Sequence, residues 1–142
     1  MADHLSKAGR SRNMAAIRSK DTKPELALRA AIRDAGVTGY RLHRRDLPGR
    51  PDLAFIRWKI AVFVDGVFWH GHPGHWNPEK AASDYWKEKI ARNIQRDREV
   101  DAALGELGWT VVRIWDEDVR HDLAGCTERV LTALRAAGRE IS

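Results

Sequence analysis

Three stretches of the chain have apolar residues at helical spacing. They cover residues 22–36, 80–107 and 124–137. Thr22 and Glu25 have the S/T-x-x-E spacing of a capping box, which favours a helix start at this point. A purely structural role for Glu25 in that cap is therefore one interpretation of this residue.

The long helical stretch carries polar residues where leucines are expected. Its apolar stripe consists of Ile90, Val100, Leu104 and Leu107. Asn93 and Asp97 fall on the same stripe. Because a buried carboxylate is unfavourable unless it is paired, Asp97 either pairs with an arginine or orients a catalytic group.

Other stretches favour strands. Two apolar runs, residues 53–56 and 60–64, are joined by a short connection centred on Trp58 and favour a β-hairpin. Residues 109–115, WTVVRIW, favour a further strand after the long helix. Strands interleaved with helices in this order predict a mixed α/β fold, in which helices flank a central mixed sheet.

The hairpin predicts a meeting of acidic groups. A turn centred on Trp58 pairs Ile56 with Ile60 and places Asp52 opposite Val64. Asp52 and Asp65 are then neighbours at the open end of the hairpin. Carboxylate and carbonyl oxygens are the ligands that Mg²⁺ takes beside substrate phosphate, although an aspartate after proline also commonly satisfies backbone groups at a turn.

Composition sets the broad class. A chain of 142 residues with 43% hydrophobic and 32% charged residues predicts one globular domain, residues 1–142. The sequence has no apolar run long enough to predict a membrane span. The polar first residues lack the apolar segment of a secretory signal. Cys126 is the single cysteine, which excludes an internal disulfide and fits a reducing cytoplasm. We therefore expect a cytoplasmic location.

Positive charge is concentrated at the front of the chain. Residues 1–50 hold twelve Lys/Arg and five Asp/Glu, whereas residues 51–142 hold thirteen and fifteen. Residues 10–20, RSRNMAAIRSK, favour a short basic helix. This distribution predicts contact with nucleic-acid phosphates, with a solvated basic surface as the alternative.

The segment VFVDGVFWHGHPGHW, residues 62–76, combines histidines with large aromatics. His70 follows the second hairpin strand, where an imidazole can accept a proton from an attacking water, although a single loop histidine is more often only a surface residue. Phe68, Trp69 and, further on, Trp86 are either core residues or side chains that insert between DNA bases.

The chain resembles the very short patch repair (Vsr) mismatch endonucleases, bacterial enzymes of the PD-(D/E)xK superfamily that nick DNA at T:G mismatches arising from deaminated 5-methylcytosine. The matching segments span almost the whole chain: RSRNMAAIRSKDTKPE, LPGRPDLAF, VFVDGVFWHGH, YWKEKIARNIQRD and LGWTVVRIWDED. The resemblance implies a restriction-endonuclease-like core. It also implies Mg²⁺-dependent hydrolysis of the phosphodiester 5′ of the mismatched thymine.

The resemblance also implies roles for particular residues. Asp52 and the backbone carbonyl of Val64 would hold Mg²⁺, and His70 would be the general base. Glu25 and Asp97 would support metal-bound waters or His70.

DNA contacts follow from the resemblance in the same way. Phe68, Trp69 and Trp86 would form a wedge on the major-groove side of the mismatch. The basic N-terminal helix would lie in the minor groove through Arg10, Arg12, Met14, Ile17, Arg18 and Lys20. The implied setting is a monomer at the bacterial nucleoid that works alongside a cytosine-C5 methyltransferase and a repair polymerase.

Two positions depart from the family pattern. Asp65 stands where the best-known pattern has a histidine, so it either binds Mg²⁺ directly or replaces the phosphate contact of that histidine. Val67 and Glu117 stand where the family commonly has ligands of a structural zinc. A weaker zinc site of His72, His75 and Glu117 is one interpretation, and replacement of the metal by packing is the favoured one.

Other functions remain compatible with this sequence. The same centre would serve a restriction or defence nuclease that cuts a specific site without a mismatch. A DNA-binding module without catalysis would need none of Asp52, His70 and Asp97. A basic globular protein with a structural metal loop would leave Asp97 on the apolar stripe unexplained.

Overall fold

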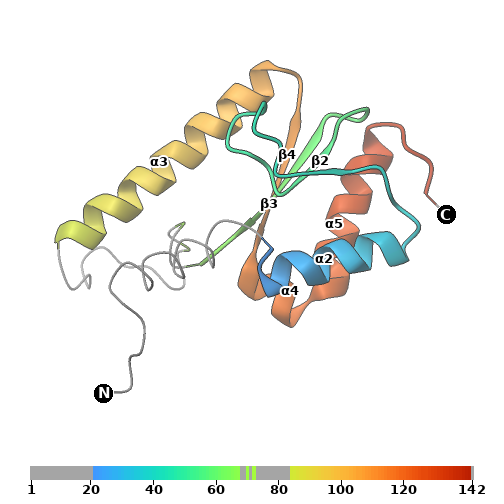
Figure 1. Cartoon of the computed structure of the whole chain (residues 1–142), viewed down its shortest axis with the longest axis horizontal. Helices are drawn as coiled ribbons and strands as arrows, with labels where there is room; N and C mark the ends of the chain where they lie inside the picture. The colour runs from blue at the N-terminus through green and yellow to red at the C-terminus, as the bar shows by residue number, and fades with distance from the viewer. Residues whose placement is uncertain (1–20, 68–69, 71, 73–83, 142) are drawn as a thin grey trace.

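The computed structural model describes residues 21–67, 70, 72 and 84–141. These residues form a four-stranded sheet with the order β1-β2-β3-β4, in which β1, β2 and β3 are antiparallel neighbours and β4 runs parallel to β3. Helix α3 lies on one face of the sheet, and α2, α4 and α5 lie on the other (Figure 1). This is a mixed α/β architecture consistent with a restriction-endonuclease-like core. The predicted helix over residues 10–20 lies outside the described residues.

The first described helix is α2, Lys23–Asp34, and it begins as the capping box predicts. Thr22 is the N-cap, and its hydroxyl accepts a hydrogen bond from the Glu25 backbone N–H at 3.4 Å. The Glu25 carboxylate accepts one from the backbone N–H of Asp21 at 2.9 Å. Leu28 and Ile32 are fully buried on the helix face that packs against α4 and α5.

The strands are β1, Arg41–Leu42; β2, Leu53–Phe55; β3, Ile60–Asp65; and β4, Thr110–Trp115. Their apolar side chains divide between two cores. One core lies between the sheet and helices α2 and α5, and contains Leu53, Phe55, Ile60, Val62, Val112 and Ile114. The other lies beneath α3, where Ala61 and Phe63 of β3 meet Leu104.

The hairpin register differs from the predicted one. Phe55, not Ile56, pairs with Ile60. Residues 56–59 form a turn in which the Lys59 N–H donates to the Ile56 carbonyl at 3.3 Å and Lys59 has a φ of 54°. The prediction was therefore wrong by one position, because Ile56 belongs to the turn, where 40% of it is exposed.

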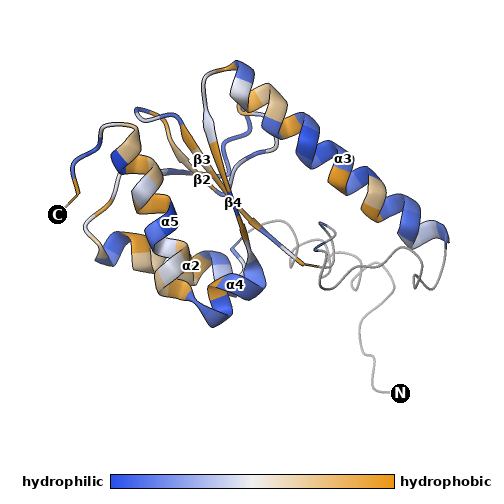
Figure 2. Ribbon diagram, turned by 180° about the vertical axis from the view of Figure 1, so that it is seen from behind, coloured by the Kyte–Doolittle hydropathy of each residue, from blue (hydrophilic) through white to orange (hydrophobic). Residues whose placement is uncertain are grey.

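The remaining helices are α3, Asp84–Glu106; α4, Asp116–His121; and α5, Leu123–Ala136. The short α4 was not predicted. Ile90 and Leu104 of α3 are buried as expected, but Leu107 follows the end of the helix and is 53% exposed, so its place on the stripe was wrong. Figure 2 shows mostly polar residues along α3 and apolar residues in the strands, as expected for a helix with one covered face. None of the helices in the described ranges has both the length and the apolar character needed to cross a bilayer.

A glycine sets the path of the chain into β2. Gly49 has a φ of 74°, and a Cβ added there would lie 2.5 Å from Val100 Cγ1 and 3.2 Å from Phe63. The loop before Asp52 therefore approaches α3 and β3 too closely for any side chain at position 49.

We predict that Gly49→Ala lowers the free energy of unfolding by about 1–3 kcal/mol more than Gly39→Ala does. Gly39 has a similar φ of 87°, but a Cβ there meets no atom within 4 Å, so it serves as the control for backbone strain alone. Urea denaturation of both variants measures the difference. Equal losses would show that the approach of residue 49 to Val100 does not constrain the loop.

Candidate active site

Acidic side chains meet where β3 ends. Asp52 directly precedes β2, and its Oδ2 accepts a hydrogen bond from the Val64 backbone N–H at 2.7 Å. In an antiparallel pair the N–H and C=O of one residue point to the same side, so the Val64 carbonyl faces the Asp52 side of the strand. The predicted neighbourhood of Asp52 and Val64 is present, although the register that led to it was wrong.

His70 lies against α3 through a short hydrogen bond. Its Nδ1 is 2.6 Å from Asp97 Oδ2, and its backbone N–H donates to the Gly66 carbonyl at 3.1 Å. An ionised carboxylate is only an acceptor, so in the neutral imidazole this contact places the ring proton on Nδ1. Nε2 is then left as the basic nitrogen.

Asp65, the last residue of β3, is 5% exposed and lies beside His70. Its Oδ1 is 3.8 Å from His70 Nε2. Both of its carboxylate oxygens accept hydrogen bonds from one nitrogen of Arg113, at 3.2 and 3.0 Å. Arg113 also donates to Asp101 at 2.8 Å.

Glu25 belongs to a second cluster on the other side of Asp52. It is 2% exposed, its Oε1 lies 3.0 Å from His43 Nε2, and Arg29 contacts both Glu25 and Asp21. The other ring nitrogen of His43 is 3.8 Å from Asp52 Oδ1. His43 therefore stands between Glu25 and Asp52, with a φ of 48° that is uncommon outside glycine.

Sequence reasoning missed His43 and Arg113. No motif marks His43, whose left-handed backbone is visible only in the fold. For Arg113 a signal was present, because a charged residue in the middle of the apolar strand TVVRIW requires a partner where a helix covers its face of the sheet.

Burial is the leading influence on the acids of this site. Burial raises the pKa of Asp52 to about 7, and the negative charges of Glu25 and Asp65 add to this rise. The hydrogen bond from the Val64 N–H acts in the opposite direction and lowers the pKa. Burial likewise raises the pKa of Asp65 and of Glu25. For His70 burial acts downward, but the Asp97 hydrogen bond and the charges of Asp65 and Asp97 outweigh it, so the pKa is raised.

The donor set fits a divalent cation. Among the described residues, two groups bring three ligand atoms within 4.8 Å of one another: Asp21, Glu25 and His43, and Asp65, His70 and Asp97. Asp52 lies between the two groups. A buried carboxylate that holds a proton up to about pH 7 is one whose negative charge lacks sufficient compensation, and a cation would supply it.

A cavity of about 180 Å³ opens next to His70. Its walls come from the loop at Gly49, from β3 and β4, and from the side of α3. The polar lining residues are Asp65, His70, Asn93, Arg96, Asp97 and Arg113. The predicted polar positions on α3 therefore face this cavity, which explains why leucines do not occupy them.

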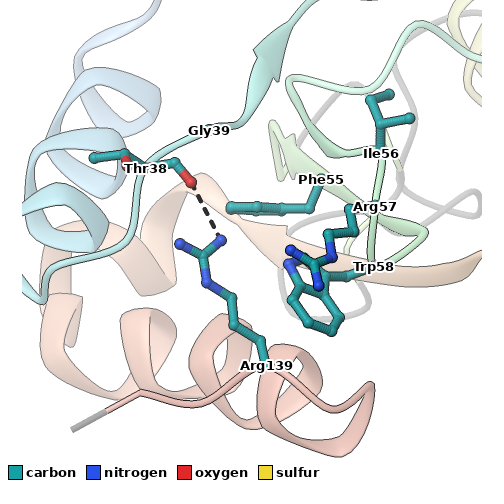
Figure 3. Close-up of a pocket in the computed structure, with 7 residues that line it drawn as sticks. All are labelled: Thr38, Gly39, Phe55, Ile56, Arg57, Trp58 and Arg139. Carbon is teal, nitrogen blue, oxygen red and sulfur yellow. Dashed lines mark hydrogen bonds between the residues drawn. The ribbon is translucent and has the colours of Figure 1, made fainter.

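A larger hollow, of about 280 Å³, lies at the turn of the hairpin rather than at its open end. Figure 3 shows Arg57 stacked on Trp58 and Arg139 reaching to the Thr38 carbonyl, with the Phe55 ring between them. Among the described residues, no carboxylate or histidine lines this hollow, so none of them supplies a group for metal binding or proton transfer there.

The other predicted site residues are only partly described. His72 packs edge-on against Trp115, with ring centroids 4.7 Å apart, and neither His72 nor Glu117 belongs to a metal-capable group of the described residues. Trp86 is half-buried and packs edge-on against Tyr85. The predicted residues outside the described ranges are His75, Phe68, Trp69, Arg10, Arg12, Met14, Ile17, Arg18 and Lys20.

Comparison with known proteins gives consistent matches. Residues 2–77 match the family model described as DNA mismatch endonuclease Vsr. The type II nicking enzyme V.NmeDIP of Neisseria meningitidis serogroup C is 42% identical over 94% of this chain and 90% of its own length. V.XorIIP of Xanthomonas oryzae is 43% identical over 94% and 98%, and the DNA mismatch endonuclease Vsr of Escherichia coli K12 is 38% identical over 82% and 74%.

We predict that metal-free protein loses stability as the pH rises from about 4 to about 7. The pKa of Asp52 is about 7 when folded and 3.8 ordinarily, so the folded state binds more protons in this window. The contribution of the protonated Asp52 to the free energy of unfolding is complete below about pH 4 and is lost as the pH rises through about 7. Asp52→Asn removes this titration, and above pH 7 it should raise the free energy of unfolding by at most about 4 kcal/mol.

Urea denaturation in EDTA at several pH values measures this effect. Asp46→Asn is the control, because Asp46 is a surface carboxyl whose pKa is lowered by its hydrogen bond to Arg44. If wild type and Asp52→Asn change in parallel with pH, burial of the Asp52 charge is not the constraint described above.

Proposed function

The chain belongs to the Vsr family of DNA mismatch endonucleases, and from this premise we propose that it nicks duplex DNA 5′ of the thymine in T:G mismatches. The reaction is Mg²⁺-dependent phosphodiester hydrolysis, and it begins very short patch repair. That the chain is a DNA endonuclease follows from the family itself. The proposal adds the mismatch, the strand and the metal.

The observation that carries the chemical part is the hydrogen bond of 2.6 Å between His70 and Asp97. It leaves Nε2 as the basic nitrogen, 3.8 Å from Asp65 Oδ1, and His70 and Asp65 both line the same cavity. Nε2 accepts a proton from the water that attacks the phosphorus. Asp97 then stabilises the positive ring, and its contribution to the raised pKa of His70 has the same origin.

Asp52 and the Val64 carbonyl would hold Mg²⁺, because the Val64 N–H donates to Asp52 Oδ2 and the carbonyl of the same residue faces the same side of the strand. When bound, the ion supplies positive charge to the phosphate and to the leaving oxygen. Glu25 would orient water around that position through its contacts with His43 and Arg29. Arg96, which lines the cavity, would meet the backbone phosphate of the cut strand.

Mismatch selection would rest on the aromatic residues. Phe68 and Trp69 directly precede His70 in the sequence. A wedge formed by them would therefore lie next to the proposed general base along the chain. A T:G wobble stacks less firmly than a normal pair, and unstacking costs a few kcal/mol per step, so insertion is least costly at the mismatch. Trp86 at the start of α3 would support this wedge, and Arg10, Arg12, Arg18 and Lys20 would bind phosphates.

A second candidate keeps the same chemistry without the mismatch. Two of the relatives reported above, from Neisseria meningitidis and Xanthomonas oryzae, are named type II nicking enzymes. A nicking enzyme for a short specific site in ordinary duplex DNA would need the same Asp52, His70 and Asp97. The first candidate, the mismatch endonuclease, would act as a monomer. It would work alongside a methyltransferase and a repair polymerase.

A strand-specific nicking assay with Mg²⁺ separates these candidates. The substrates form a pool of duplexes with T:G or T:A at one position and varied flanking bases, each strand carrying its own label. We expect nicking of the thymine strand of T:G duplexes only. Asp52→Asn should abolish nicking, by at least about 10³-fold, while duplex affinity stays within about threefold of wild type.

Equal nicking of T:A and T:G duplexes would replace the mismatch proposal by the second candidate. Nicking by Asp52→Asn at the wild-type rate would refute the assignment of the metal ligand. Asp46→Asn is the matched control, because it removes an exposed carboxylate on the same chain and should nick normally.

A further inference from the structure

Asp65 and Arg113 are placed together by the register of the sheet. Phe63 of β3 pairs with Arg113 of β4, and Asp65 follows two residues after Phe63 on the same face. The guanidinium of Arg113 lies over the Phe63 ring, 4.2 Å from its centroid, and extends toward the end of the strand. It therefore reaches Asp65 without leaving the surface of the sheet.

Arg113 contacts acidic residues on both sides of His70. Besides its two hydrogen bonds to Asp65, its Nη1 lies 3.7 Å from Asp97 Oδ1, and its Nη2 donates to the Asp97 backbone carbonyl at 3.5 Å. The imidazole is 2.6 Å from Asp97 at Nδ1 and 3.8 Å from Asp65 at Nε2. One guanidinium thus ties together the two carboxylates between which the His70 ring lies.

The contacts of Arg113 indicate a role for Asp65, the residue that follows Val64. Both Asp65 oxygens are directed at Arg113, so a cation bound by Asp65 would lie against a guanidinium. Asp52 has a different environment, because its Oδ1 lies 3.8 Å from His43 Nδ1 and no arginine of the described ranges contacts it. Asp65 therefore has a guanidinium partner within the protein, whereas Asp52 has none among the described residues.

We propose that Arg113 is a positioning residue of the nicking reaction, which fixes Asp65 and Asp97 on opposite sides of the His70 ring and thereby holds Nε2 toward the phosphate. Asp65 acts as the partner of Arg113 and not as a metal ligand. This inference rests on the proposed nuclease function of the same site, and it adds two roles that the family resemblance leaves open.

A double-mutant cycle tests the proposal. Arg113→Met should lower kcat at saturating Mg²⁺ by at least about tenfold, corresponding to about 1.4 kcal/mol in activation free energy, with KM for DNA within about threefold of wild type. Asp65→Asn should lower kcat in the wild-type background but have at most a twofold to threefold effect beside Arg113→Met, because the two residues act as a unit. Arg113→Lys should recover part of the rate.

The cycle Glu128→Gln with Arg135→Met is the matched control. This ion pair of 2.7 Å is on the surface of α5, and its removal should leave kcat unchanged. Additive losses at Asp65 and Arg113, or a loss confined to KM, would overturn the proposal. The double variant keeps the test valid if Arg113→Met alone folds poorly, since it removes both charges of the pair together.

A second readout does not require cleavage. The His70 ring nitrogens can be observed by ¹⁵N NMR, with Asp97→Asn as the reference for a ring without its carboxylate partner. In Arg113→Met the Nδ1–H signal should exchange with water at least about tenfold faster than in wild type. An unchanged signal would overturn the positioning role, whereas absence of nicking by the wild-type chain on every duplex would instead overturn the proposed function.

A metal titration completes the assignment of Asp65. Mn²⁺, followed by its paramagnetic signal, should bind Asp65→Asn within about threefold of wild type and should not bind Asp52→Asn measurably. A loss of binding in Asp65→Asn equal to that in Asp52→Asn would make Asp65 a metal ligand and would overturn its role as the partner of Arg113.

Discussion

The hydrogen bond from the Val64 backbone to Asp52 holds a carboxylate where water reaches it poorly. Its side chain is 15% exposed, and its neighbours include two further buried acids, Glu25 and Asp65. An ionised group at this depth is unfavourable unless positive charge compensates it. The pKa of Asp52 is raised to about 7 because burial disfavours its ionised form. The other side chains of the centre surround this carboxyl group.

Two histidines lie near this carboxylate, each with acidic partners of its own. His70 is held by Asp97 from α3 and lies beside Asp65 from β3. His43 contacts Glu25 from α2, in a cluster with Arg29. Among the described residues, Arg113 contacts the acids beside His70 and Arg29 contacts those beside His43, whereas no arginine contacts Asp52.

Much of this centre could be predicted from the sequence. Asp97 was recognisable because a carboxylate on an apolar helical stripe needs a reason, and the cavity beside His70 supplies one. Asp52 was recognisable from its place at the start of a strand. The capping box of α2 was also predicted correctly, and the Glu25 carboxylate of that cap contacts His43 as well.

What the sequence could not supply depends on backbone geometry and on contacts between distant segments. The hairpin register depended on whether Ile56 belonged to the strand or to the turn, and the left-handed conformation of Lys59 decided it. His43 comes within reach of Glu25 and Asp52 only because the chain turns through a positive φ there. Arg113 meets Asp65 through parallel pairing of strands that are separated by the whole of α3.

The most direct test of the account is the number of protons released when a divalent ion binds. Calorimetric titration of Mn²⁺ into the metal-free protein, in buffers of different ionisation enthalpy, measures that number at each pH. The account predicts release of more than about half a proton per ion at pH 6.5 and nearly none at pH 8.5, because Asp52 is largely protonated below pH 7 and must ionise to bind. Binding at pH 6.5 without proton release, or undiminished binding by Asp52→Asn, would contradict it.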